Sequence, residues 1–243
     1  MNESVAKLVK RRLGKSILRY AVDPFISGIY AGDPEKLIVR YALPKLYALE
    51  HEYGSFIKGA IKRRKIIAAE KAAGITKSVF SVAGGLENLI RALVHEIGDE
   101  HILTGVKDVR VEPLHDKFLC KFNVNGESRE LVAEKIISTV DGLSVASLLP
   151  FIPREVMEKI TVIRYAKVVQ VVVGFKHWKG IPLRAFGGLI PSKEKKDILG
   201  ILFPSALFKN RAPEGGVLLS VFAGGMKRME IKCRVCLSFL SRE

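Results

Sequence analysis

The sequence predicts a mixed α/β (α+β) fold, with a helical first third followed by segments rich in β-strand. Residues 4–20 place apolar side chains at helical spacing, whereas from Ser78 onward short apolar runs alternate with Gly, Pro and Asn. The runs 168–175 and 217–222 are nearly continuous in β-branched and aliphatic residues, which is typical of buried strands. The chain is therefore expected to combine a helical region with at least one sheet.

The first third is expected to hold several helices. Ser4 is a suitable N-cap for a helix over residues 4–20, whose opposite face is basic. Asp23-Pro24 is expected to end that helix, because proline disfavours helical geometry in the residue before it, and 24–34 is expected to be a glycine-punctuated turn region. Pro44 predicts a helix running to about Tyr53. Another helix, holding Ile57, Ile61, Ile66 and Ile67, is expected after Gly54-Ser55.

The middle of the chain mixes both kinds of element. A helix is expected over Leu86–Ile97, ending at Gly98. Asn125-Gly126 is a strong hairpin signal after the strand 118–124. Further short strands are expected at 102–104, at 106–111 and, buried, at 136–140, followed by a short helix to Leu149.

The last third holds the segment that suggests a binding site. Residues 168–175 are expected to form a central strand, and 201–203 and 217–222 two further strands, with Gly187-Gly188-Leu189 as a turn. The pairs Gly187-Gly188 and Gly224-Gly225 let backbone approach a ligand closely, so large side chains beside them would form a flat pocket for a planar molecule. The alternative is a set of core strands with ordinary hairpin loops.

Composition narrows the class of protein. The 243 residues are 48% hydrophobic and 27% charged, which describes a soluble globular chain. No apolar run is long enough to span a membrane and no signal peptide is apparent, so a cytoplasmic location is expected. The net charge of +15 favours an anionic membrane surface over nucleic acid, because the few aromatic residues lie in apolar runs. The densest basic cluster is 58–65; the alternative for it is a solvated helix face.

Several kinds of chemistry have no motif in this sequence. The histidines show no metal-ligand spacing, and Cys233-x-x-Cys236 is a lone pair that cannot complete a zinc site. The sequence contains no G-x-S-x-G, no Walker loop and no G-x-G-x-x-G turn. Neither a metal nor a catalytic acid or base is therefore predicted.

Three motifs resemble one known family. They are GGLIPSKE at 187–194, GILFPSALFKNRAPEGGVLLSVFAGG at 200–225 and DPFISGIYAGDP at 23–34. Together they resemble the FAD-dependent protoporphyrinogen oxidases of the flavin amine oxidase superfamily, over residues 3–231. The resemblance implies a helical, membrane-associating region at 1–77, the central segment of the FAD-binding domain at 78–150 and a mixed substrate-binding sheet at 151–231. Residues 232–243 depart from the family pattern.

The resemblance also implies an activity and a site. The family oxidises protoporphyrinogen IX or coproporphyrinogen III to the porphyrin in haem biosynthesis, with dioxygen as the electron acceptor. By position in the motifs, Leu189, Leu202 and Phe222 would line the macrocycle site, and Val106 would present backbone to the adenine of FAD. Peripheral association with the inner face of the cell membrane and a homodimer accord with the resemblance.

Part of the family pattern is missing from this sequence. Without the G-x-G-x-x-G turn that holds the FAD pyrophosphate, the chain is expected to be an inactive partial copy that binds FAD poorly, as an interrupted reading frame or a partial gene would produce. One alternative is another flavin amine oxidase or a desaturase-type oxidoreductase that shares the glycine-helix unit. The other is a non-catalytic basic protein that associates with lipid or nucleic acid.

Overall fold

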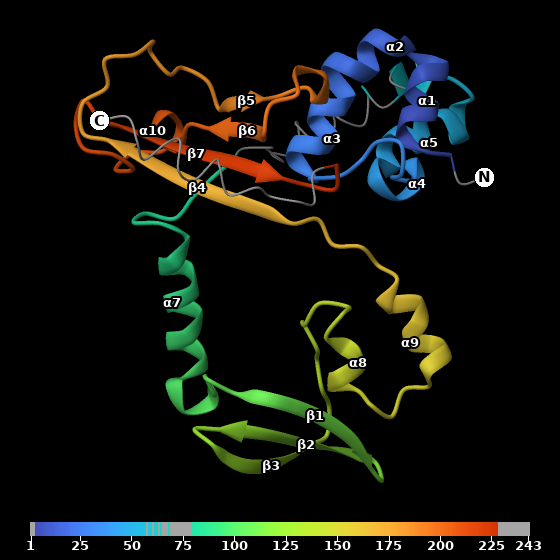
Figure 1. Cartoon of the computed structure of the whole chain (residues 1–243), viewed down its shortest axis with the longest axis vertical. Helices are drawn as coiled ribbons and strands as arrows, with labels where there is room; N and C mark the ends of the chain where they lie inside the picture. Colours follow the sequence, from blue (N-terminus) through green and yellow to red (C-terminus); the bar gives the residue numbers. More distant parts are fainter. Residues whose placement is uncertain are drawn as a thin grey trace. The chain divides into compact units, whose positions relative to one another are not determined.

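The computed structural model describes residues 3–56, 58–59, 61–62, 64, 68 and 79–227, and confirms the mixed α/β fold (Figure 1). The chain forms two compact units: unit 1 comprises residues up to Ser81 and from Ala166 onward, and unit 2 comprises Val82–Tyr165. The predictions for Ile57, Ile66 and Ile67, for part of the basic cluster, and for Cys233 and Cys236 lie outside the described residues. The domain boundaries near residues 77, 150 and 231 remain a prediction.

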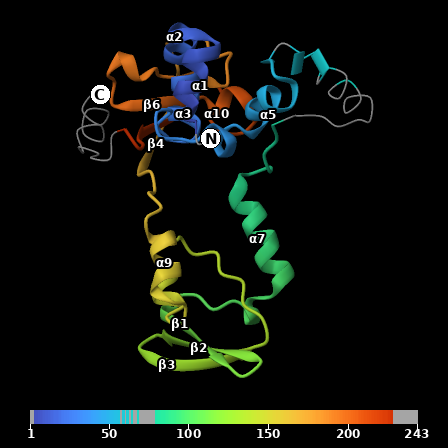
Figure 2. The ribbon, with the colours of Figure 1, turned by 90° about the vertical axis from the view of Figure 1, so that its right-hand side faces the viewer.

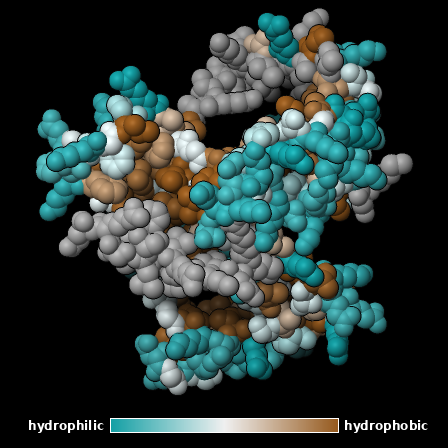
Figure 3. Space-filling model, turned by 45° about the horizontal axis from the view of Figure 1, so that its top comes forward, coloured by the Kyte–Doolittle hydropathy of each residue, from teal (hydrophilic) through white to brown (hydrophobic). Residues whose placement is uncertain are grey.

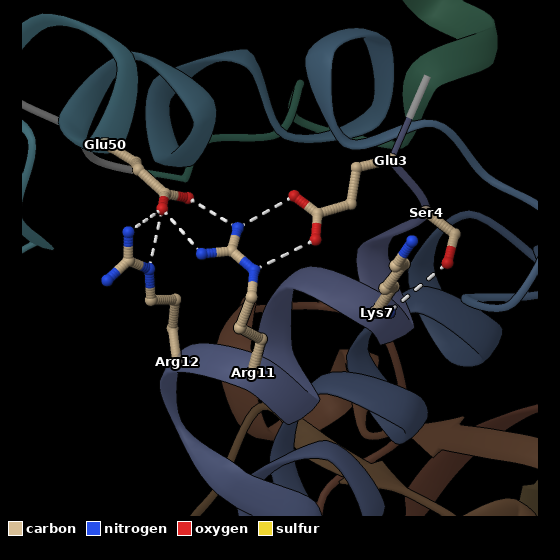
Figure 4. Close-up of polar contacts among 6 residues, drawn as sticks. All are labelled: Glu3, Ser4, Lys7, Arg11, Arg12 and Glu50. Carbon is tan, nitrogen blue, oxygen red and sulfur yellow. Dashed lines mark hydrogen bonds and ion pairs between the residues drawn. The ribbon is translucent and has the colours of Figure 1, made fainter. Parts of the chain in front are cut away.

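Unit 1 begins with a run of short helices. They are α1 (Val5–Arg12), α2 (Gly14–Ile17), the π-helix η1 (Leu18–Val22), α3 (Asp23–Ile29), α4 (Val39–Ala42) and α5 (Pro44–Tyr53). Ser4 caps α1 as predicted, because its Oγ accepts a hydrogen bond from the backbone N–H of Lys7 at 3.2 Å (Figure 4). The apolar side of α1 is fully buried with residues of α3 and α4, and the helix is therefore a core element. This core contains Val5, Ala6, Leu8, Val9, Leu18, Ile26 and Val39.

The single helix predicted over residues 4–20 ends at Arg12, a new helical run begins at Gly14, and this run does not stop at Asp23-Pro24. A π-helical turn over Leu18–Val22 leads directly into α3, which has Pro24 in its first turn. Proline is tolerated at that position because the first N–H groups of a helix have no intrahelical acceptor. The predicted turn region is therefore helical up to Ile29.

The sheet of unit 1 has the strand order β4-β7-β6-β5, with every neighbouring pair antiparallel. Its strands are β4 (Val168–Phe175), β5 (Gly187–Leu189), β6 (Ile198–Leu202) and β7 (Val217–Gly224), accompanied by the 3-10 helix η3 (Ser192–Glu194) and by α10 (Pro204–Leu207). Two predictions were wrong. The segment 187–189 is a strand, because it pairs with β6, and β4 lies at an edge of the sheet because only β7 pairs with it among the described residues.

Unit 2 contains α7 (Leu86–Ile97), the 3-10 helix η2 (Asp99–His101), β1 (Lys107–Leu114), β2 (Lys117–Val124), β3 (Glu127–Ala133), α8 (Val145–Leu148) and α9 (Arg154–Thr161). The strands form an antiparallel sheet in the order β1-β2-β3. The predicted hairpin is confirmed: Asn125 and Gly126 both have positive φ, 53° and 86°, as a type I′ turn requires. Helix α7 also has the predicted bounds.

Two strands predicted in unit 2 are absent from its described residues. Neither 102–104 nor 136–140 pairs with another strand, and Ile137 is 91% exposed. Apolar β-branched residues alone do not make a strand, because the extended backbone needs a neighbour for its hydrogen bonds. The strand predicted at 106–111 begins at Lys107 and continues to Leu114.

Many apolar side chains of the described residues reach the surface, where brown atoms adjoin teal ones (Figure 3). Within unit 2, α7 and α9 stand apart in both views (Figures 1 and 2), and the apolar face of α7 is exposed at Leu86, Leu89, Ile90, Leu93 and Ile97. Of the helices that the structure describes, none combines the length and apolar character needed to cross a membrane.

The basic face of α1 is neutralised by glutamates from elsewhere in unit 1 (Figure 4). Arg11 donates hydrogen bonds to Glu3 and, at 2.8 and 3.1 Å, to Glu50, and Arg12 also donates to Glu50. Lys10 pairs with Glu35 at 2.7 Å. The Arg11 hydrogen bond, followed by that of Arg12, lowers the pKa of Glu50. This face therefore holds α1 to the chain around it.

Replacing Glu50 with Gln should lower the free energy of unfolding at neutral pH by about 1 kcal/mol, because exposed ion pairs contribute up to about that much. The pKa of Glu50 is lower in the folded state, so its stabilisation is present above the unfolded pKa and is lost as pH falls through the folded pKa. Chemical denaturation across this pH range measures the difference. Glu35→Gln, which removes one exposed ion pair, is the control and should lower the free energy of unfolding less. An equal loss of stability in the two variants would show that the contacts of Glu50 with two arginines add nothing beyond a single pair.

Candidate functional site

The strand register brings the predicted substrate residues onto one face of the unit 1 sheet. Leu189 lies opposite Gly200, Gly200 lies opposite Phe222, and Phe222 lies opposite Gln170. Directly paired residues of an antiparallel sheet point to the same side. Leu189, Gly200, Phe222 and Gln170 therefore form one row across all four strands.

A second row lies beside the first on the same face. It runs from Gly187 on β5 through Leu202 and Ser220 to Val172 on β4. Because side chains two residues apart along a strand share a face, Leu202 neighbours both Leu189 and Phe222. The structure thus brings together all three side chains predicted to contact the macrocycle, and their contact with a substrate stays a prediction.

This face is open at its β4 side. Val168, Gln170 and Val172 are exposed and Phe222 is half-buried. The alternate residues face the other side of the sheet, where Val221 is only 2% exposed. The face that holds Phe222 is therefore an apolar surface with room above it in the described part of unit 1.

Helix α3 forms a wall at the other side of the face, beside β5 and β6 (Figure 1). The side chain of Leu189 lies between two glycines. A Cβ added to Gly28 of α3 would lie 2.5 Å from Leu189 Cδ2, and one added to Gly200 would lie 3.0 Å from the same atom. Leu189 therefore lies over the backbone of Gly200 and in close contact with α3 at Gly28, where a side chain on residue 28 would force the leucine to move.

A polar pair interrupts this apolar face, and sequence reasoning missed it. Gln170 Nε2 donates a hydrogen bond to Ser220 Oγ, and Ser220 is only 3% exposed. The available signal was a single glutamine among the β-branched residues of 168–175. Its partner is 50 residues away in sequence, so the pair can be identified only once the register of β4 against β7 is known.

A buried carboxylate joins α3 to the sheet, and it was missed as well. Asp23, 7% exposed, accepts hydrogen bonds from the Ser192 backbone N–H at 2.8 Å, from Ser192 Oγ at 3.0 Å and from Lys227 Nζ. Lys227 also donates to Ser192 Oγ at 3.1 Å. Burial raises the pKa of Asp23, but the hydrogen bonds from Lys227 and Ser192 outweigh it, so the pKa lies below its usual value. Asp23 is therefore ionised and structural.

A cavity of about 160 Å³ lies beside this carboxylate, lined by Ser27, Ile190, Ser192, Gly225 and Lys227 among others. Ligand pockets for drug-sized molecules usually measure about 300–1,000 Å³. This cavity is too small for a tetrapyrrole. A second hollow of about 310 Å³ borders Asp23 as well, and charged residues such as Lys10, Arg19 and Lys193 form much of its lining. The open sheet face is the apolar surface among these candidates, and it is therefore the candidate site for a flat apolar ligand.

Unit 2 holds the residue predicted to face FAD. Val106 is half-buried in the loop directly before β1, and α7 begins after Gly84 and Gly85, whose φ angles are 79° and 119°. This glycine turn, helix and valine fit the adenine-facing segment implied by the family resemblance. The chain has no G-x-G-x-x-G turn to hold the pyrophosphate, so its residues do not fit a complete FAD site.

Other catalytic chemistry lacks support among the described residues. They contain no cluster of His, Cys, Asp and Glu suited to a metal ion. Cys120 lies in β2, where burial raises the pKa of its thiol and so disfavours the reactive thiolate. The open sheet face is an apolar surface, and its role as a binding site stays a prediction.

Comparison with known proteins identifies the family. Residues 1–235 match the family described as flavin containing amine oxidoreductase. The chain belongs to this family. Its residues 23–34, 187–194 and 200–225, on which the resemblance was based, all lie inside the matched range.

Several amine oxidoreductases are similar over nearly the whole chain. It is 29% identical to the mitochondrial protoporphyrinogen oxidase of Nicotiana tabacum, covering 95% of this chain and 50% of that protein. It is 27% and 26% identical to the protoporphyrinogen oxidases of Bos taurus and Homo sapiens, covering all of this chain and 51% of each. The chain thus spans about half the length of these curated relatives.

Solved structures show the same fold. A crystal structure from Exiguobacterium sp. 255-15, provisionally assigned as a protoporphyrinogen oxidase, superposes with a TM-score of 0.71 at 20% identity, covering 91% of this chain and 45% of that one. A protein from Pyrococcus furiosus superposes with a TM-score of 0.62 at 17% identity, covering 99% of this chain and 54% of that one. At these identities the likeness concerns the fold alone.

Replacing Asp23 with Asn should lower the free energy of unfolding of this amine oxidoreductase chain by about 2 kcal/mol, since hydrogen bonds to charged groups contribute roughly 1.5–3 kcal/mol. Because the pKa of Asp23 is lowered on folding, the two proteins should converge in stability as pH falls through the folded pKa. Denaturant titration measures this. Asp33→Asn is the control: Asp33 Oδ1 accepts the Glu35 N–H at 3.0 Å, and an asparagine oxygen can do the same.

The purified chain should contain no stoichiometric flavin, because the glycine turn and helix N-terminus that bind the pyrophosphate are missing from the sequence. The absorbance of flavin released on denaturation measures this. Release of one FAD per chain would contradict the prediction.

Proposed function

We propose that this chain forms the substrate-facing part of a flavin-dependent oxidoreductase that converts a porphyrinogen, protoporphyrinogen IX or coproporphyrinogen III, to the porphyrin. The observation that supports this most is the meeting of Leu189, Leu202 and Phe222 on one open sheet face. The similarity to curated protoporphyrinogen oxidases supports the substrate class.

The dimensions and chemistry of the face suit a flat apolar ligand. Neighbouring strands lie about 4.8 Å apart, so Leu189 and Phe222, separated by β6, span about 10 Å. Gly200 between them lies beneath the Leu189 side chain, and Leu202 lies beside it toward Phe222. An aromatic ring packs best against another π-system in an offset arrangement, which Phe222 can offer to a pyrrole ring.

The residues of this chain would bind, orient and shield the macrocycle. In the intact family the flavin supplies the redox chemistry, and dioxygen is the proposed electron acceptor. Apolar contact at Phe222, Leu202 and Leu189 removes water from the bound macrocycle, which suits a hydrogen transfer that solvent would otherwise compete with. No protein acid or base is assigned a role in this step.

Association with an anionic membrane surface stays a prediction for this protein. The first helix contributes little to it, because Lys10, Arg11 and Arg12 are paired with glutamates and the apolar side of α1 is buried. The exposed cations Lys58, Lys62 and Arg64 are the described members of the cluster on which the prediction depends.

Binding of protoporphyrin IX, followed by quenching of its fluorescence, tests the proposed site. Phe222→Ala should weaken binding about tenfold, the effect of losing roughly 1.4 kcal/mol of apolar and aromatic contact. Phe175→Ala is the matched control, because Phe175 is also on this sheet but its register with Val217 places it on the opposite face.

The proposal predicts that Phe175→Ala leaves porphyrin affinity unchanged. Equal affinity of the wild-type chain and Phe222→Ala would show that the face is not the site. Absence of porphyrin binding by the wild-type chain would favour another amine oxidoreductase substrate.

A further inference from the structure

We propose that Gln170, held in place by Ser220, distinguishes the reduced macrocycle from the oxidised one by accepting hydrogen bonds from pyrrole N–H groups of the porphyrinogen. This inference rests on the proposed function and extends it, because it assigns substrate-over-product selectivity to a polar pair. Gln170 is thus a proposed specificity residue on the sheet face that holds Phe222.

The register places Gln170 at the centre of the open part of that face. It lies directly opposite Phe222, with Val168 and Val172 two residues away on either side. All three β4 side chains are exposed. A ligand that stacks on Phe222 would therefore also cover Gln170, the one polar residue in its strand.

Ser220 sets the orientation of the Gln170 amide. Ser220 lies two residues before Phe222 on the same strand and face, and its buried hydroxyl accepts the hydrogen bond from Gln170 Nε2. A carboxamide that donates through its nitrogen to the sheet turns its oxygen the other way. No residue in the described part of the chain donates to Gln170 Oε1, so this oxygen is available to a donor above the face.

The two states of the macrocycle differ in the donors that they offer. A porphyrinogen has saturated carbons between its pyrroles, so the rings tilt and their N–H groups can point together to one side of the macrocycle. A porphyrin is flat and conjugated, and its fewer N–H groups lie in the ring plane and point at its centre. An acceptor lying beneath the ring can therefore bind the reduced form and not the oxidised form.

The surroundings of the pair strengthen this discrimination. Phe222, Leu202 and Val172 present no hydrogen-bonding side chain, so an N–H group buried against them would remain unsatisfied without Gln170. An unpaired donor in an apolar site is costly, and a site built to accept an N–H therefore rejects the analogue that lacks it. Oxidation would remove the hydrogen bond and favour release of the product.

The test compares the affinities of the full chain for protoporphyrinogen IX, kept reduced under anaerobic conditions, and for protoporphyrin IX. In the wild-type chain the reduced form should bind more tightly. Gln170→Leu should keep binding of the porphyrin and lower the preference for the porphyrinogen by about three- to tenfold, the effect of one hydrogen bond of ordinary strength.

Two further variants separate a hydrogen-bonding role from a packing role. Gln170→Glu keeps an acceptor oxygen at the same side-chain length and should retain the preference for the reduced form. The Ser220 hydroxyl would then donate a hydrogen bond to the carboxylate and hold it in place. Val172→Ala removes apolar contact on the same face and should weaken both ligands alike. Gln170→Leu leaves the buried Ser220 hydroxyl without this partner, so its unfolding midpoint is measured alongside the affinities. Val172 is exposed, and Val172→Ala should change the midpoint little.

The outcomes distinguish this inference from the function on which it rests. If Gln170→Leu binds both ligands with the wild-type preference, or if Gln170→Glu loses that preference as Gln170→Leu does, Gln170 is not the discriminating group while the site itself stands. If the wild-type chain binds neither ligand, the proposed function is wrong and the inference falls with it.

Discussion

The buried carboxylate of Asp23 is the interaction on which the candidate site most depends. It joins residues 169 and 204 positions away in sequence, Ser192 and Lys227, to the first residue of α3. A buried charge is stable only when its hydrogen-bonding capacity is met, and here two donors from Ser192 and one from Lys227 meet it. These contacts fix where α3 begins relative to the ends of β5 and β7.

The position of α3 then shapes the sheet face. Five residues after Asp23, Gly28 lies against Leu189, and Leu189 in turn lies over Gly200. Helix, leucine and bare strand backbone thus stack in that order and cover the face at its β5 side. The β7 and β4 side, with Phe222 and Gln170, stays open. A buried ion pair therefore anchors the helix that covers one side of this face.

The sequence predicted local structure well where the spacing of apolar residues and the capping or turn residues indicated the same element. Ser4 acts through its own hydroxyl, and Pro44, Gly98 and Asn125-Gly126 act through their own backbone geometry, so neighbouring residues suffice to interpret them. The prediction failed where tertiary pairing decides, as for the unpaired apolar segment 136–140 and for Pro24 inside a continuous helical run.

The site needed more than local rules. Family resemblance named Leu189, Leu202 and Phe222, but only the register shows that they share a face, because a shift of one residue would turn each strand over. The Gln170–Ser220 and Asp23–Ser192 contacts join residues 50 and 169 positions apart. No spacing rule in one sequence identifies such pairs.

Strand β4 combines an unprotected edge with exposed apolar side chains on the face that holds Phe222. Edge strands are usually protected from aggregation by charge, by proline or by a bulge, and residues 168–175 contain no charged residue and no proline and pair with β7 without a register shift. Val168 and Val172 are exposed along it, on the face that holds Phe222. Burial of apolar surface at such a strand is favourable, by roughly 25 cal/mol per Å². A flat apolar ligand above Phe222 would obtain part of its binding energy from this strand, with Gln170 supplying the polar contact that an all-valine strand would lack.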